Sequence, residues 1–245
     1  VDGRDETGRL GRAFSEMLAS LSRARRSQHQ LVQDAGHELR TPLTSLRTNI
    51  SVMRRFGELS PGTREQLLDD LDSETRELTD LVNELVELAT DRRDDEVPVD
   101  VVMADVARVV ADRASRRFGR DISVDADETT VVARPQALER AMSNIVGNAV
   151  KFSDGPVQVV CRNGRFEAFD RGPGLAEDDL PHVFDRFYRS LSARSLPGSG
   201  LGLSIVRDVA ESHGGRVHAA NRTDGPGSVI GFTLPVAARQ RDAGS

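Results

Sequence analysis

One histidine, His37, lies in a segment whose residue types suit nucleophilic chemistry, His37-Glu38-Leu39-Arg40-Thr41-Pro42-Leu43-Thr44. A neutral imidazole is a nucleophile near neutral pH, and Glu38 beside it can hold the proton of the other ring nitrogen. A helix would place Thr41, four residues on, on the face of His37. Pro42 removes one helical hydrogen bond and favours a bend next to His37. A lone histidine is usually a plain surface side chain, and this proline inside a strong helical pattern sets His37 apart.

Three polar residues on a helix predicted over residues 135–152 suit magnesium and phosphate. Asn144, Asn148 and Lys151 are spaced by four and three, so at about 100° per residue they fall within a sector of roughly 60°. An amide oxygen suits the hard cation Mg²⁺, and an ammonium group suits a phosphate. Lys151 is the only lysine in the chain. A solvated helix face is the alternative interpretation of these three residues alone.

Two glycine-rich segments suit the remaining parts of a nucleotide. Asp170-Arg171-Gly172-Pro173-Gly174-Leu175 follows a predicted strand, and Asp170 there would be a fixed acceptor for an exocyclic amine, although a simple tight turn fits equally well. Gly198-Ser199-Gly200-Leu201-Gly202-Leu203 runs into a helix, where backbone N–H groups favour an anion. It is neither a Walker P-loop nor a dinucleotide fingerprint. The polar segment Tyr188–Pro197 is predicted to be a lid over the ligand.

Composition excludes several classes of function. The net charge of −6 provides no global basic field for nucleic acid. No histidine or cysteine pair has the spacing of metal ligands, so no zinc site is expected. Cys161 is the only cysteine, which excludes an internal disulfide. No apolar run approaches the roughly 20 residues of a membrane helix.

The elements that must position these residues change in style near residue 95. Before it, apolar residues recur at helical spacing in three runs, of which the first extends from Leu10 to Leu31. A helix-breaking stretch, Phe56–Thr63, separates the other two runs, and Thr63 with Gln66 fits a capping box that restarts the helix. The sequence therefore predicts an αα-hairpin. Each helix has only a narrow apolar seam, so two hairpins are expected to pair as a four-helix bundle in a homodimer. The other two runs are Leu39, Leu43, Leu46, Ile50, Met53 and Leu67, Leu71, Leu78, Leu81, Leu85, Leu88.

After residue 95 the pattern is mixed α/β. Asn163-Gly164 between two alternating runs is a strong type I′ hairpin signal. Helices are predicted over residues 105–117, 135–152 and 203–213, and strands over residues 121–125, 129–133, 157–162, 165–169, 216–220 and 228–234.

Taken together, these residues resemble the transmitter region of two-component sensor histidine kinases over roughly residues 5–236. Single motifs are weak, but five in the family's order are very specific. They are the H box at His37–Leu43, the N box at Asn144–Ser153, the G1 box at Asp170–Gly174, the F box at Phe184–Tyr188 and the G2 box at Gly198–Leu203. The resemblance implies four regions: residues 1–24, the end of a HAMP signal-relay helix; residues 25–92, a dimerisation and histidine-phosphotransfer hairpin; residues 98–237, a catalytic ATP-binding domain; and residues 238–245, a disordered tail.

The resemblance also implies a fold and a set of roles. The expected fold class is α plus α/β, a dimeric four-helix bundle followed by an α/β sandwich of the Bergerat type. His37 would be the phosphoacceptor, Glu38 its general base, and Thr41 would position water in the reverse, phosphatase reaction. Asn148, helped by Asn144, would hold Mg²⁺. The ATP-binding residues would be Asn144, Asn148, Lys151, Asp170, Gly172, Gly174, Phe184, Arg186, Tyr188, Gly198, Gly200, Leu201, Gly202 and Leu203.

By the same resemblance, the expected partners are ATP, Mg²⁺, a second copy of the chain and the receiver domain of a response regulator. This part of the protein would be cytoplasmic, and the whole protein anchored in the cell membrane. Two alternatives stay open. One is an ATPase of the gyrase or Hsp90 type, for which Glu139 is a candidate base, but which leaves the His37 hairpin unexplained. The other is a dimer that binds nucleotide and relays a signal without phosphoryl transfer.

Overall fold

The computed structural model describes residues 14, 17–18, 33, 35–37, 39–54, 57, 60–89, 96–190, 193 and 198–237. They divide into two compact units, Val1–Val82 and Asn83–Ser245. The predicted HAMP helix is described at only three positions, and the predicted tail lies outside the described residues. None of the helices in the described ranges is long and apolar enough to cross a membrane.

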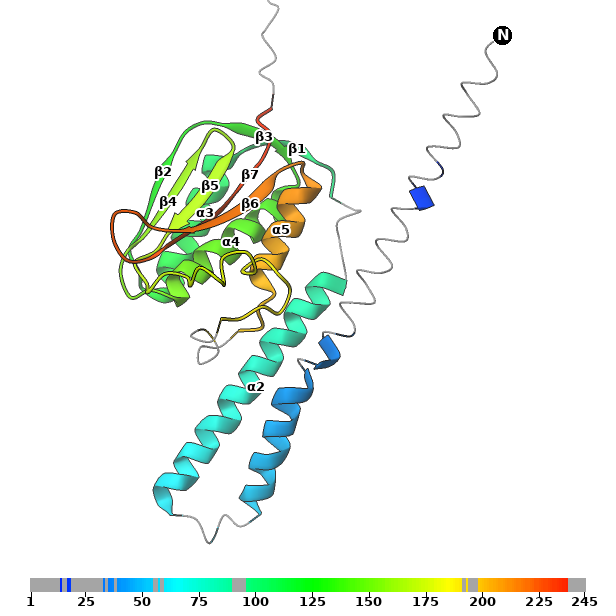
Figure 1. The fold of residues 1–245 in the computed structure, drawn as a ribbon, viewed down its shortest axis with the longest axis vertical. Coiled ribbons are helices and arrows are strands. Elements are labelled where there is room, and N and C mark those ends of the chain that lie inside the picture. Colours follow the sequence, from blue (N-terminus) through cyan, green and yellow to red (C-terminus); the bar gives the residue numbers. More distant parts are fainter. Residues whose placement is uncertain are drawn as a thin grey trace, which may run out of the picture. The chain divides into compact units, whose positions relative to one another are not determined.

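The first unit is a helical hairpin (Figure 1). Residues 39–53 form one helix and α2 (Pro61–Ala89) the other. Leu67 and Leu81 of α2 are buried, at 6% and 5% exposure. The predicted capping box at Thr63 is wrong. The Oγ of Ser60 accepts a hydrogen bond from the backbone N–H of Thr63 at 3.2 Å, so Ser60 caps a helix that begins with Pro61.

The second unit is built on a five-stranded sheet of order β2-β4-β5-β7-β6, in which only β2 and β4 run parallel. A separate two-stranded sheet pairs β1 with β3. β1 was not predicted, because a strand of only four residues is too short to show a clear alternation of apolar and polar residues. The strands are β1 (Val99–Val102), β2 (Ile122–Ala126), β3 (Thr130–Ala133), β4 (Val157–Arg162), β5 (Arg165–Phe169), β6 (Arg216–Asn221) and β7 (Ser228–Thr233).

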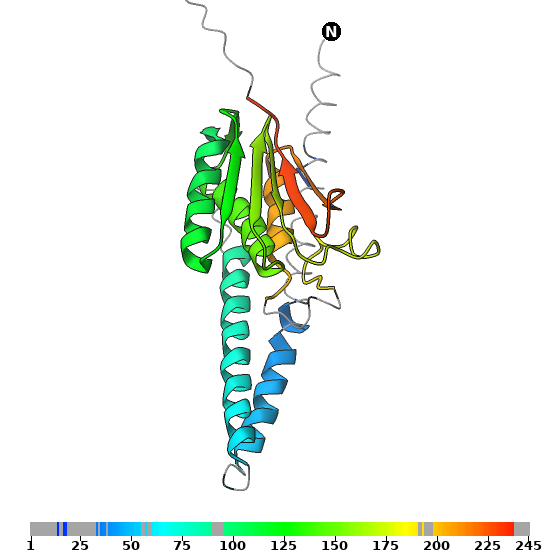
Figure 2. The ribbon, with the colours of Figure 1, turned by 90° about the vertical axis from the view of Figure 1, so that its left-hand side faces the viewer.

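Three helices cover one face of this sheet, α3 (Met103–Phe118), α4 (Pro135–Lys151) and α5 (Gly202–Ser212) (Figures 1 and 2). Alternate residues of β4 and β5 are buried, and the rings of Phe166 and Phe232 stack at 5.6 Å between centroids in this layer. The core therefore lies between the sheet and the helices, and α4 occupies its centre with seven buried residues.

The start of α4 is fixed by the end of α5. The backbone N–H of Arg134, the N-cap of α4, donates to Nε2 of His213 at 3.0 Å. Nδ1 of His213 lies 2.7 Å from the carbonyl oxygen of Val209, so Nδ1 donates and Nε2 accepts. The imidazole of His213 thus joins the end of α5 to the start of α4, the helix that carries Asn144, Asn148 and Lys151.

Candidate functional site

A cavity of about 450 Å³ opens in the second unit beside α4. Its wall includes ten of the predicted nucleotide residues, Asn144, Asn148, Lys151, Asp170, Gly174, Tyr188, Gly198, Gly200, Gly202 and Leu203. They come from one face of α4, from the long connection between β5 and α5, and from the first residues of α5. The fold therefore brings the predicted groups together around one space.

The polar face of α4 forms one side of this cavity. Asn144, Asn148 and Lys151 all line it, as the spacing on the helix predicts. Among the described residues, the amide nitrogen of Asn144 is buried and has no hydrogen-bond partner. A buried amide left unpaired costs about 1–3 kcal/mol, so a ligand that pairs with it would recover that cost.

At another part of the wall, Asp170 is held as a fixed acceptor. Its residue is only 4% exposed, and Oδ1 accepts hydrogen bonds from the backbone N–H of Gly172 at 2.7 Å and of Ser228 at 3.2 Å. The hydroxyl of Ser228 donates to Oδ2. Ser228 also lines the cavity, a position that the sequence did not predict for this first residue of a predicted strand.

The proposed phosphoacceptor lies in the other unit. Residues 35–37 and 39–53 are helical through Pro42, and both His37 and Thr41 are exposed. Glu38, the predicted base, lies outside the described residues. Because its imidazole is exposed, a ring nitrogen of His37 can attack a phosphoryl group that is brought to it from outside the helix. The hydroxyl of Thr41 lies one turn along the same helix.

Known proteins share both parts of this arrangement. Residues 27–93 match the family model of the His Kinase A (phospho-acceptor) domain, and residues 133–238 match that of histidine kinase-, DNA gyrase B- and HSP90-like ATPases. The solved structure of the mycobacterial sensor histidine kinase MprB is 34% identical, with a TM-score of 0.52, over 56% of this chain and 98% of that one. The chain belongs to the sensor histidine kinase family.

Two further relatives extend the similarity along the kinase chain. The signal transduction histidine-protein kinase/phosphatase MprB of Mycobacterium tuberculosis (strain H37Rv) is 39% identical over 254 residues, covering 96% of this chain and 50% of the relative. The structure of full-length ShkA in complex with AMPPNP is 26% identical, with a TM-score of 0.50, over 86% of this chain and 46% of that one. The chain thus spans about half the length of the curated relatives it matches. The predicted order of a helical hairpin followed by an α/β domain is confirmed.

Four predicted nucleotide residues of the kinase lie outside the cavity wall, Gly172, Phe184, Arg186 and Leu201. Gly172 runs behind Asp170, where a Cβ would lie 2.2 Å from the carbonyl oxygen of Phe152. Phe184 and Leu201 are core residues, at 7% and 0% exposure. These three residues therefore support the site by packing behind it and do not line the cavity.

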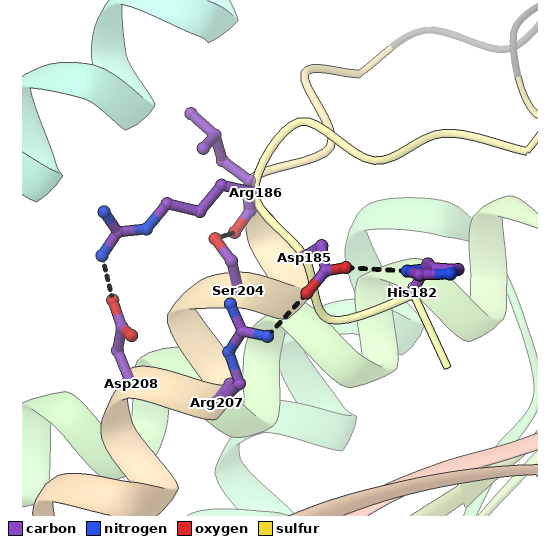
Figure 3. Close-up of polar contacts among 7 residues, drawn as sticks. His182, Asp185, Arg186, Ser204, Arg207 and Asp208 are labelled. Carbon is purple, nitrogen blue, oxygen red and sulfur yellow. Dashed lines mark hydrogen bonds and ion pairs between the residues drawn. The ribbon is translucent and has the colours of Figure 1, made fainter. Parts of the chain in front are cut away.

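Arg186 is instead part of a polar cluster between the F box and α5 (Figure 3). Its NH2 lies 2.9 Å from Oδ2 of Asp208, while Oδ1 of Asp185 lies 2.8 Å from NH1 of Arg207. The acidic–basic pair Asp185-Arg186 thus forms two ion pairs with the basic–acidic pair Arg207-Asp208 of α5. Oδ2 of Asp185 also lies 3.0 Å from Nδ1 of His182. The hydrogen bond from His182 and then that from Arg207 hold the pKa of Asp185 below its ordinary value.

The kinase cavity also has a wall that the sequence did not predict. Five residues of α3 line it at the spacing i, i+3, i+4, i+7 and i+8, which is one helix face: Val110, Arg113, Ala114, Arg117 and Phe118. In the predicted lid, Arg189, Ser190 and Ala193 line the cavity, and residues 191–192 and 194–197 lie outside the described residues. An amphipathic pattern shows that a helix has two faces, but not that a cavity touches one of them.

Glu139, the candidate base of the ATPase alternative, lies outside the cavity wall. Its Oε1 is 2.6 Å from NH1 of Arg113, across the contact between α3 and α4. A carboxylate held by an arginine away from the ligand space is badly placed to activate water there. This position favours the kinase interpretation over the ATPase one.

Proposed function

We propose that this kinase binds Mg-ATP in the cavity, phosphorylates His37 and passes the phosphoryl group to an aspartate of a response regulator. One observation carries the proposal: a buried carboxylate acceptor and a row of amide and ammonium groups converge on a single cavity. In the first step a bond forms between phosphorus and a ring nitrogen of His37, the bond to the β,γ-bridging oxygen breaks, and ADP leaves. Positioning and charge stabilisation supply most of such catalysis.

In this proposal the two ends of the nucleotide meet different chemistry. Asp170 accepts the exocyclic amine of adenine, and the N–H groups of the 198–203 segment with the ammonium of Lys151 meet the phosphates. The ShkA structure contains an ATP analogue, AMPPNP, which supports the proposal that this fold binds an adenine nucleotide.

Magnesium fits the donor set of α4. Amide oxygens are hard ligands, and Mg²⁺ commonly takes one or two protein ligands, with phosphate oxygens and waters as the rest. Asn148, helped by Asn144, would hold it, and both line the cavity. When bound, the ion would neutralise phosphate charge, while Asn144 and Lys151 would fix the direction of the chain of phosphates.

We also propose that Thr41 serves the phosphatase reaction, in which the regulator is dephosphorylated. Its hydroxyl lies one turn from His37 on an exposed helix and would position water against the phosphorylated aspartate of the regulator. The name of the 39% identical relative, a kinase/phosphatase, supports a bifunctional enzyme. Membrane anchorage of the whole protein and the HAMP helix stay predictions from the family resemblance.

The decisive experiment is labelling with ATP carrying ³²P at the γ position. Because His37 is an exposed imidazole on the hairpin helix, label is expected on wild type and on His29→Gln, and at background on His37→Gln. The label should be acid-labile and alkali-stable, as a phosphorus–nitrogen bond requires. Label that persists in His37→Gln would refute the assignment. ATP hydrolysis without label would favour the ATPase alternative, and nucleotide binding with neither would favour the relay.

A further inference from the structure

The last residue of β6, Asn221, holds one end of the loop that carries Asp170. Oδ1 of Asn221 accepts a hydrogen bond from the backbone N–H of Leu175 at 2.7 Å, and Nδ2 of the same side chain donates to the carbonyl oxygen of Leu175 at 2.7 Å. One amide thus satisfies both backbone groups of one residue, in the geometry of a strand pair. Leu175 itself lines the cavity.

Arg222, the first residue of the turn between β6 and β7, contacts the other end of the loop. Its side chain is only 7% exposed, and NH1 donates to the carbonyl oxygen of Asp170 at 3.4 Å. Its orientation is fixed by Asp224, which accepts from Nε at 3.0 Å and from NH2 at 2.7 Å. The guanidinium carbon lies 5.7 Å from the centroid of the Phe169 ring. A bidentate carboxylate pair leaves such a guanidinium little freedom to move.

The turn touches the loop closely enough to transmit a displacement. Arg222 donates its backbone N–H to the carbonyl oxygen of Gly227 at 3.0 Å, which closes the turn. A Cβ on Gly227 would lie 2.1 Å from the carbonyl oxygen of Asp170 and 2.9 Å from Cδ of Arg222. Ser228, directly after Gly227, supplies two of the donors to the Asp170 carboxylate. The backbone of Gly227 therefore packs directly against the backbone of Asp170, and a shift of the turn would move Asp170 as well.

We propose that Asn221 and Arg222 are positioning residues that fix the Asp170–Leu175 loop at both ends and so set the selectivity of the site for adenine. The inference rests on the proposed function, in which Asp170 receives the adenine amine. A single hydrogen bond discriminates between bases only if its acceptor is held in place, since a loop free to shift by a fraction of an ångström can adapt to a base that lacks the amine. The phosphate end of the cavity lies on other elements and should not depend on this turn.

The test compares two nucleotides by isothermal titration calorimetry on the whole chain. Inosine diphosphate lacks the exocyclic amine, so the ratio of its dissociation constant to that of ADP measures adenine selectivity. We expect wild type to bind ADP at least roughly tenfold more tightly, as one hydrogen bond to a charged group allows. Asn221→Ala and Arg222→Ala should each weaken ADP by roughly five- to tenfold and change inosine diphosphate by less than about twofold.

Controls separate positioning from general damage. Thr223→Ala, exposed in the same turn, should keep the wild-type ratio. Arg222→Lys should restore part of the selectivity lost in Arg222→Ala, and tripolyphosphate affinity should not change in any variant. If Asn221→Ala is poorly folded by thermal melting, Asn221→Asp replaces it. That variant keeps the shape but sets a carboxylate oxygen against the Leu175 carbonyl.

Equal weakening of both diphosphates, or an unchanged ratio, would overturn the positioning role while leaving the proposed function standing. Wild type that binds neither nucleotide would defeat the proposed function itself, and this inference with it.

Discussion

Asp170 illustrates how much of the site is decided by single residues and their hydrogen bonds. An ionised carboxylate offers about four acceptor positions. Gly172 and Ser228 occupy three of them, through two backbone N–H groups and one hydroxyl. Asp170 lines the cavity, so a donor on a ligand can occupy the fourth acceptor position of its carboxylate. The exocyclic amine of adenine is such a donor.

Asn148 is the residue whose replacement tests the phosphate end. Asn148→Asp exchanges a group that can donate and accept for an acceptor with a negative charge beside a triphosphate. We expect ATP-dependent labelling of His37 to fall by at least roughly tenfold, since a displaced phosphate chain loses its alignment with the acceptor. Asn83→Asp, an exposed position on α2, is the matched control and should label normally. Wild-type labelling in Asn148→Asp would remove the residue from the proposed site.

At the scale of elements, local pattern predicted most of the fold. The strands β4 and β5 were predicted with the observed bounds, and α4 within one residue, because alternation and helical spacing are properties of short segments. Asn163 and Gly164 have the positive φ angles, 53° and 75°, that a type I′ turn needs. The start of α2 was misplaced because Ser60 and Thr63 are both good caps, and the pattern alone did not favour Ser60.

The junction between the F box and α5 gives a prediction about two elements. Arg186 and Asp208 are 19% and 17% exposed, so reversing one charge sets like charges together in a partly desolvated place. Arg186→Asp alone should cost about 1–3 kcal/mol of unfolding free energy. Arg186→Asp combined with Asp208→Arg should recover at least half of that loss in a double-mutant cycle measured by urea unfolding. If the double variant is only as stable as the sum of the single losses predicts, the pair has no coupling.

The same junction should respond to acid through Asp185. Its pKa is lowered by the hydrogen bond from His182 and then by Arg207, so the folded state favours the ionised carboxylate. The stabilisation is therefore present above the ordinary value of 3.8 and is lost as pH falls through the lowered folded value. In urea unfolding, the difference between wild type and Asp185→Asn should be constant above a pH of about 5 and shrink below about 3.8. A difference that grows on acidification would have the wrong sign.

At the scale of the whole molecule, the candidate site shows where sequence reasoning ends. Helical spacing placed Asn144, Asn148 and Lys151 on one face, and the glycine segments marked two loops. Ser228, Asn221 and Arg222 were missed, because only the pairing of β5, β7 and β6 brings them to Asp170. The wall supplied by α3 was missed for the same reason. Contacts between distant segments depend on topology, which no local pattern encodes.

The hairpin carries a last prediction, on assembly. Apolar side chains remain exposed on both helices, with Leu43 at 52%, Ile50 at 53% and Leu68 at 49%, although Leu67 and Leu81 are buried. Two apolar stripes per hairpin fit a four-helix bundle of two chains. Ile50→Lys should therefore shift the protein from dimer to monomer in sedimentation equilibrium, with helical circular dichroism largely kept. Thr48→Lys, also exposed on that helix, should remain dimeric. The predicted bundle would bury Ile50 against a second chain. A dimer that survives Ile50→Lys, or wild type that is monomeric at micromolar concentration, would therefore contradict the prediction.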